Sequence, residues 1–153
     1  MAGVTAPALA GPPYDTDDPE PTETGHWEIY MFAAGKRAAH LTEGSGGLDL
    51  NYGPVKGVQL TATLPLAFTN EGGNHVGAGN IEAGLKYQLL KSERTQTSVA
   101  IFPRAILPTG GKRFGAGRVA VLLPLWGQKD FGRWSLFGGG GYLINPGLGQ
   151  RDF

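Results

Sequence analysis

The chain has 153 residues, 13 basic and 13 acidic side chains, and no cysteine. Its length corresponds to one domain, and its zero formal charge gives no indication of the broad basic surface of a nucleic-acid-binding protein. The lack of cysteine excludes disulfides, zinc–thiolate sites and thiol catalysis. Glycine accounts for 26 residues, far above the usual share of about 7%, which favours a sheet with tight turns over a helical bundle.

The first 25 residues differ in composition from the rest of the chain. Ala8-Leu9-Ala10 resembles the small-residue end of a signal peptide, although a plain Ala/Pro tail has the same composition. Residues 11–25 are Pro-rich and acidic, which predicts an extended segment. We therefore divide the chain into residues 1–25, a signal-peptide remnant with an extended Pro- and Asp-rich segment, and residues 26–153, the β domain.

The β domain contains seven segments that are predicted to be strands. Residues 80–90, NIEAGLKYQLL, alternate strictly between apolar and polar side chains, which is the pattern of a strand with two different faces. A strand of about ten residues is long for a soluble protein and matches a tilted strand that crosses a bilayer. The seven predicted strands are residues 26–38, 46–53, 57–68, 79–90, 96–107, 117–127 and 133–144.

The links between these strands are expected to alternate in length. Short links at 53–56, 91–95 and 128–132 alternate with longer, Gly-rich links at 40–45, 69–78, 108–116 and 145–150. Bacterial outer-membrane barrels combine short periplasmic turns with longer outer loops in this way. No run of about 18 apolar residues is present, which excludes a transmembrane helix but leaves barrel strands possible. The fold prediction is therefore an all-β, antiparallel up-and-down meander, forming all or part of a transmembrane β-barrel of about 7–8 strands.

Charged side chains of both signs fall on the polar face of the predicted strands. Such groups would cost several kcal/mol each in hydrocarbon, so we expect them to face a polar lumen or one another. A network of ion pairs that braces a narrow barrel is one interpretation, and a lining that selects a solute is the other. Glu82 and Lys86 are expected to pair with neighbouring strands, because they lie about 13 Å apart along their own strand. The candidate lumen-lining residues are Glu28, Asp49, Glu82, Lys86, Arg104 and Arg118.

Aromatic side chains gather near the predicted strand ends, where a barrel has its interfacial girdles. An ordinary aromatic core is the alternative interpretation. These side chains are Trp27, Tyr52, Phe68, Tyr87, Trp126, Trp134 and Tyr142.

No motif for catalysis or for a cofactor is recognised. His26, His40 and His75 have no paired spacing for a metal, and no serine lies in a GxSxG elbow. We therefore predict no enzyme, no cofactor and no metal site. The acidic run near the N-terminus lacks the glycine and the spacing of an EF-hand loop, so we interpret it as a solvated tail rather than a Ca²⁺ site. It comprises Asp15, Asp17, Asp18 and Glu20.

The order of several segments resembles a family of Gram-negative outer-membrane barrels described as transporters or as "MetA-pathway of phenol degradation". The segments are PPYDTDDPEP, GHWEIY, LDLNYGPVKGVQLTATLPLAF, IEAGLKYQLL, FPRAILPTG and LPLWGQKDFGRWSLFGGGGYLINPG. The resemblance covers almost all of residues 11–153. It implies a membrane barrel with a role in uptake or efflux and without agreed catalytic residues. Members of the family continue past the NPG-containing loop, so the resemblance also implies a barrel that is incomplete at the C-terminus.

These observations lead to one expected function and two rivals. We expect a non-enzymatic outer-membrane transporter or channel of a Gram-negative bacterium, in contact with outer-membrane lipid, for small solutes that are aromatic or otherwise apolar. The main rival is a soluble, lipocalin-like β-barrel that binds an apolar ligand and buries the apolar face inside. The other is a structural or enzymatic outer-membrane barrel, which would need a catalytic Ser/His pair close in space. The sequence leaves the oligomeric state and the direction of transport open.

Overall fold

The computed structural model describes residues 18–38, 40–115 and 117–145. Throughout these residues the regular structure is β, which confirms the predicted fold class. The strands are β1 (Trp27–Ala38), β2 (Leu41–Val55), β3 (Val58–Thr69), β4 (His75–Ala78), β5 (Glu82–Ser92), β6 (Thr97–Ile101), β7 (Arg104–Ile106), β8 (Ala120–Phe131) and β9 (Trp134–Ile144).

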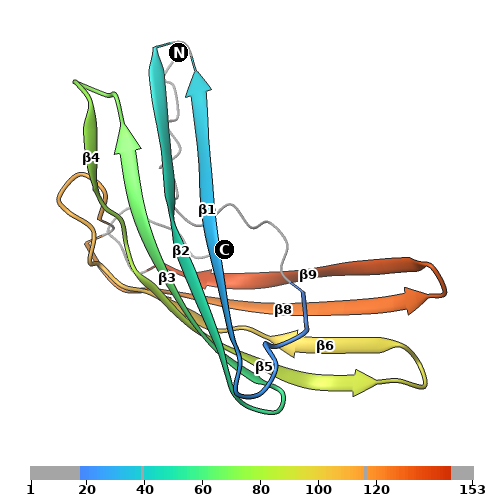
Figure 1. The fold of residues 1–153 in the computed structure, drawn as a ribbon. Helices are drawn as coiled ribbons and strands as arrows, with labels where there is room; N and C mark the ends of the chain where they lie inside the picture. Colours follow the sequence, from blue (N-terminus) through green and yellow to red (C-terminus); the bar gives the residue numbers. More distant parts are fainter. Residues whose placement is uncertain (1–17, 39, 116, 146–153) are drawn as a thin grey trace.

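The strands form one antiparallel meander, as predicted. Each long strand pairs with the next one along the chain, while short β4 pairs with β3 beyond the end of β5. β6 and β7 together fill the place between β5 and β8, and β9 pairs with β8. Figure 1 shows the sheet bent strongly into an open trough, with β1 and β9 as its outer strands.

β2 begins earlier than the sequence predicted. Residues 41–45, expected in a long link, pair with β1, and residues 43–45 also pair with β3. Glycine makes this pairing possible, because an added Cβ at Gly44 or Gly47 would overlap a carbonyl oxygen of the neighbouring strand. The link between β1 and β2 is consequently two residues long, and the predicted alternation of short and long links was wrong at this position.

Three further boundaries differ from the prediction by three or four residues, and the others agree within two. β5 begins at Glu82 instead of residue 79, and the short strand β4 was not predicted. β8 continues to Phe131, so the turn to β9 lies at residues 132–133 instead of 128–132. β8 also starts at Ala120, three residues later than predicted, because residues 117–119 belong to the preceding link. The turn between β2 and β3 lies at residues 56–57, where Gly57 adopts a φ of 78° that favours glycine. The longer links, residues 70–81 with β4 and residues 107–119, lie where long links were expected.

The predicted strand at 96–107 is divided into β6 and β7 at Phe102-Pro103. Its register against β5 is the same before and after the break. Pro103 accepts a hydrogen bond from the Leu85 N–H at 3.0 Å but has no N–H to return. Pro124 on β8 likewise accepts from the Phe102 N–H at 3.0 Å. Two ladder hydrogen bonds are therefore missing at adjacent positions, while the alternation of side chains continues across the break.

The two faces of the sheet differ sharply in polarity and exposure. On the apolar face, Leu60 is 45%, Leu85 41% and Leu123 44% exposed. On the polar face, Glu82 is 5% and Lys86 only 3% exposed. A soluble protein normally shows the opposite distribution. The side with these leucines is the apolar face of the sheet, and the side with Glu82 and Lys86 is the polar face.

Candidate functional site on the polar face

The predicted charged residues meet on the polar face because of the strand register. Asp49 on β2 lies opposite Thr63 on β3, which lies opposite Glu82 on β5. In the same way, Gln59 on β3 lies opposite Lys86 on β5. Directly opposed residues of antiparallel strands point to the same face. The register therefore gathers polar groups from three strands into one surface.

A continuous hydrogen-bond network fixes the β2–β3 part of this surface. Both carboxylate oxygens of Asp49 accept hydrogen bonds, one from the Thr63 hydroxyl at 2.6 Å and one from the Asn51 side-chain amide at 3.1 Å. The Asn51 oxygen in turn accepts from Gln59 at 2.7 Å and from Thr61 at 2.6 Å. Buried polar groups that are mutually satisfied in this way hold their side chains in fixed positions.

The β5–β7 part of the surface is built around a buried aromatic ring. Phe102 is 2% exposed, and its ring centre lies 3.9 Å from the guanidinium carbon of Arg104 and 5.1 Å from the ammonium nitrogen of Lys86. Gly84 lies beneath the ring, where an added Cβ would come within 2.8 Å of it. Both cations thus lie within the range of a cation–π interaction. Arg104 and Asp49 are also the charges that act on the buried Glu82 carboxyl.

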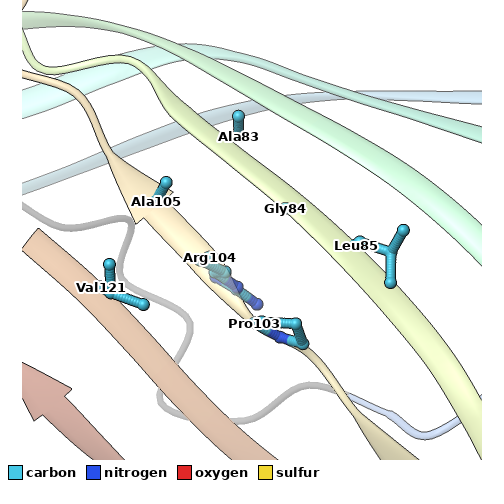
Figure 2. Close-up of a pocket in the computed structure, with 7 residues that line it drawn as sticks. All are labelled: Ala83, Gly84, Leu85, Pro103, Arg104, Ala105 and Val121. Carbon is cyan, nitrogen blue, oxygen red and sulfur yellow. The ribbon is translucent and has the colours of Figure 1, made fainter.

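The opposite, apolar face has a shallow depression of about 320 Å³ at the break between β6 and β7. Figure 2 shows Ala83, Gly84 and Ala105, which have little or no side chain, beside it, so that the sheet is thinly covered where Pro103 interrupts the ladder. No acid–base pair lines this depression, which makes it an apolar surface feature and not the candidate site. It is lined by Ala83, Gly84, Leu85, Pro103, Arg104, Ala105 and Val121.

Residues 18–25, which we call the N-terminal strap, lie against the polar face. Glu20 accepts hydrogen bonds from the Lys91 ammonium at 2.6 Å and from the Ser98 hydroxyl at 2.7 Å. The Asp18 carboxylate lies 3.6 Å from the Lys86 ammonium, and Thr22 donates to Gln59 through both its backbone N–H and its hydroxyl. Figure 1 shows this segment, in dark blue, inside the bend of the sheet beside β5.

The structure brings most of the predicted site residues together. Asp49, Glu82, Lys86 and Arg104 lie on the central part of the polar face, on strands β2, β5 and β7. Glu28 lies on the same face, opposite Asn51, but on outer strand β1, where it is exposed and accepts a hydrogen bond from Tyr30 at 3.1 Å. Arg118 is exposed in the link before β8, so it does not occupy the strand position that was predicted.

Two interactions of this site were not predicted. Lys86 was expected to pair with a neighbouring strand, and its ion pair with Asp18 of the strap was not foreseen. The acidic tail was interpreted as solvated, whereas both of its described members, Asp18 and Glu20, contact lysines of β5. Asp15 and Asp17 lie outside the described residues. One sequence signal for such docking is present. Acidic residues gather just before the β domain, and the polar face of that domain carries lysines.

The described residues contain no group of three or more His, Asp or Glu side chains positioned to hold a metal ion. They also contain no helix with the length and apolar character needed to cross a membrane. Comparison of the chain with protein-family models, curated proteins and solved structures finds no match. The two faces of the sheet are therefore the features that bear on function.

Proposed function

We propose that this chain forms the wall of an outer-membrane β-barrel that lets small solutes pass, with the polar face toward the lumen and the apolar face toward lipid. The observation that carries the proposal is the inverted exposure of the two faces, with leucines exposed and ionic side chains buried. The solutes are small and aromatic or otherwise apolar, in line with the family that the sequence resembles. The chain acts without catalysis, in the outer membrane of a Gram-negative bacterium.

The apolar face supports contact with lipid because it is continuous from strand to strand. Leu48 lies opposite Leu64, and Leu60 lies opposite Leu85, so the exposed leucines are neighbours across β2, β3 and β5. An exposed apolar patch on a soluble monomer rarely exceeds a few hundred Å². A lipid-facing barrel wall requires an uninterrupted apolar band, and strands of 11 or 12 residues are long enough to cross it when tilted.

Aromatic rings at the strand ends give further support. Trp27 and Tyr52 stack with ring centres 4.7 Å apart, and Tyr87 and Trp134 are exposed on the same face near the short turns. Rings with a polar tip suit the interface between lipid and water. Trp126 is the exception among the predicted girdle residues. It follows Leu125 of the apolar face, so the alternation of β8 puts its side chain on the polar face, against its register partner Gly139.

Closing the wall requires additional pairing at β1 and β9. Six antiparallel pairings lead from β1 to β9. Because each pairing reverses the strand direction, an even number of them leaves these two outer strands running in the same direction. They cannot join each other in the antiparallel pattern of bacterial barrels. An additional antiparallel strand between them completes an even-numbered barrel, and the proposal requires such a strand in the assembled protein.

Liposome swelling tests the proposal. The assembled protein, including the strand that closes the barrel, is purified and reconstituted into liposomes, which are diluted into isosmotic solutions of a sugar or of an aromatic amino acid. We expect swelling, with faster entry of the aromatic solute, because the proposed solutes are aromatic or otherwise apolar. Heat-denatured protein is the control, and swelling no faster than with this control contradicts the proposal. A soluble, lipocalin-like binder would instead be monodisperse without detergent.

A charge reversal sharpens the test. Lys86→Glu changes a lumen charge, so we expect it to reduce the rate of entry of anionic solutes relative to cationic ones by about tenfold. Lys112→Glu makes the same change in the exposed link before β8 and should leave the ratio unchanged. An equal shift in both variants would mean that the solute does not pass along the polar face.

A further inference from the structure

The strap covers the end of the polar face that lies beside the short turns. Its partners come from three strands, namely Gln59 at the start of β3, Lys91 near the end of β5 and Ser98 at the start of β6. These positions flank the turns at residues 56–57 and 93–96. In a barrel this would be one mouth of the lumen, so the strap lies across the path that a solute would take.

The strap is seated in the sheet rather than lying loosely over it. Pro19 is fully buried, and Thr22 is 4% exposed. The Pro19 carbonyl accepts a hydrogen bond from Gln88 at 3.5 Å, and the Glu20 carbonyl accepts one from Lys86 at 3.4 Å. Lys86 is thus covered by the strap, and the polar face is closed at this position.

The strap joins the sheet through a narrow attachment. Thr24 forms a single bridge with Gly53, and the Gly25 N–H donates to the Gly53 carbonyl at 2.7 Å. Gly25 has a φ of 80°, a conformation that favours glycine, and a Cβ added to it would meet no atom within 4 Å. The chain can therefore change direction at Gly25 without moving β1.

We propose that the strap is a gate, which closes this mouth when docked and swings about Gly25 to admit a solute. This inference rests on the proposed function, because it assigns a regulation to the same passage. The strap is suited to this role because side-chain contacts hold it, with one bridge to the sheet, whereas each strand has a ladder of backbone hydrogen bonds. Its ion pair from Glu20 to Lys91 is half exposed, and such pairs contribute little to stability. Release of the strap therefore costs much less than opening of the sheet.

Cysteine labelling measures whether the strap covers the polar face, independently of transport. The chain has no cysteine, so Gln88→Cys introduces a single reporter beneath the strap. We measure its reaction rate with a water-soluble thiol reagent in the complete, detergent-solubilised protein. Adding Glu20→Ala removes the contacts to Lys91 and Ser98, and we expect labelling to become about tenfold faster. Glu23→Ala is the matched control, because the Glu23 side chain is 87% exposed in the same segment.

A charge swap guards against a variant that simply misfolds. Glu20→Lys should accelerate labelling as Glu20→Ala does, and combining it with Lys91→Glu should restore the slow rate. Unchanged labelling in Glu20→Ala, or equal acceleration in Glu23→Ala, overturns the gate. So does failure of the double variant to slow the reaction again.

Liposome flux separates the gate from the underlying passage. We expect Glu20→Ala to increase the swelling rate about tenfold over that of the unmodified protein, with no change for Glu23→Ala. Measurable flux that is equal in the unmodified protein and in Glu20→Ala overturns the gate and leaves the passage standing. Absence of flux in every variant overturns the proposed function, and the gate with it.

Discussion

The guanidinium of Arg104 lies 3.9 Å from the centre of the Phe102 ring, on the polar face of the sheet. Both residues belong to the strand that Pro103 interrupts, so this contact spans the place where ladder hydrogen bonds are missing. Phe102 also covers Gly84 on β5. The ring therefore compensates for the lost backbone bonds by packing the interrupted strand against its neighbour.

Truncation of this ring should destabilise the sheet. We expect Phe102→Ala to lower the free energy of unfolding by about 3 kcal/mol, because it removes a fully buried aromatic side chain. Denaturant titration followed by tryptophan fluorescence, in detergent, measures the change. Phe137→Ala on outer strand β9 removes an exposed ring and should cost less than about 1 kcal/mol. Equal losses in the two variants would contradict a special role for Phe102.

The glycine run of β9 offers a second comparison. A Cβ at Gly139 would lie 2.6 Å from the Trp126 ring and would overlap the carbonyl oxygen of Leu125, whereas a Cβ at Gly138 would meet no atom within 4 Å. We expect Gly139→Ala to reduce the free energy of unfolding by about 1–3 kcal/mol, since the overlap forces β8 and β9 apart. Gly138→Ala should be neutral or slightly stabilising. The same titration measures both, and the reverse order would be inconsistent with this packing.

The sequence was sufficient to predict the long strands and their two faces. Alternation in residues 80–90 placed Glu82 and Lys86 on one side and Leu85 on the other, because a strand's side-chain period of two is visible in the sequence itself. The start of β2 was missed for the opposite reason. Its residues 42–45, TEGS, contain no apolar side chain, and their pairing depends on close backbone approach, which glycine permits but does not encode.

The contacts of the strap could not be predicted, because they depend on three-dimensional proximity. Glu20 meets Lys91 and Ser98, which lie more than 70 residues further along the chain. An acidic, Pro-rich segment has the same composition whether it remains solvated or docks on lysines. The break at Phe102-Pro103 was missed because the apolar alternation continues through it, while the missing proline N–H affects hydrogen bonding alone.

The polarity of the two faces leads to a third prediction. Leu85→Arg places a cation on the apolar face, where a lipid-facing barrel should lose about 2–4 kcal/mol of stability near the bilayer centre. Leu85→Ala removes the same apolar side chain without adding charge, and should cost less. Folding yield into lipid vesicles, measured by a shift in electrophoretic mobility without heating, reports the difference. Arginine tolerated as well as alanine would indicate that this face meets water.

Docking of the strap should depend on pH through Glu20. Burial raises the pKa of the Glu20 carboxyl, but hydrogen bonds from Lys91 and Ser98 outweigh this effect, and the pKa falls below its ordinary value of 4.5. The released strap therefore binds a proton more readily than the docked strap. The contribution of Glu20 to docking is fully present above the ordinary pKa, and it is lost as the pH falls through the lower pKa of the docked state.

A fluorophore attached at Glu23→Cys can follow this release. As the pH is lowered from about 6 to about 3, we expect the fluorescence anisotropy of the dye to fall in the protein with Glu20, because the released strap moves more freely than the docked strap. In Glu20→Gln the strap has no carboxylate at this position, so the anisotropy should already be lower at neutral pH. Asp18 also faces a lysine, Lys86, at 3.6 Å, and Asp18→Asn isolates its share. A transition that is identical with and without the Glu20 carboxylate would show that another group controls docking.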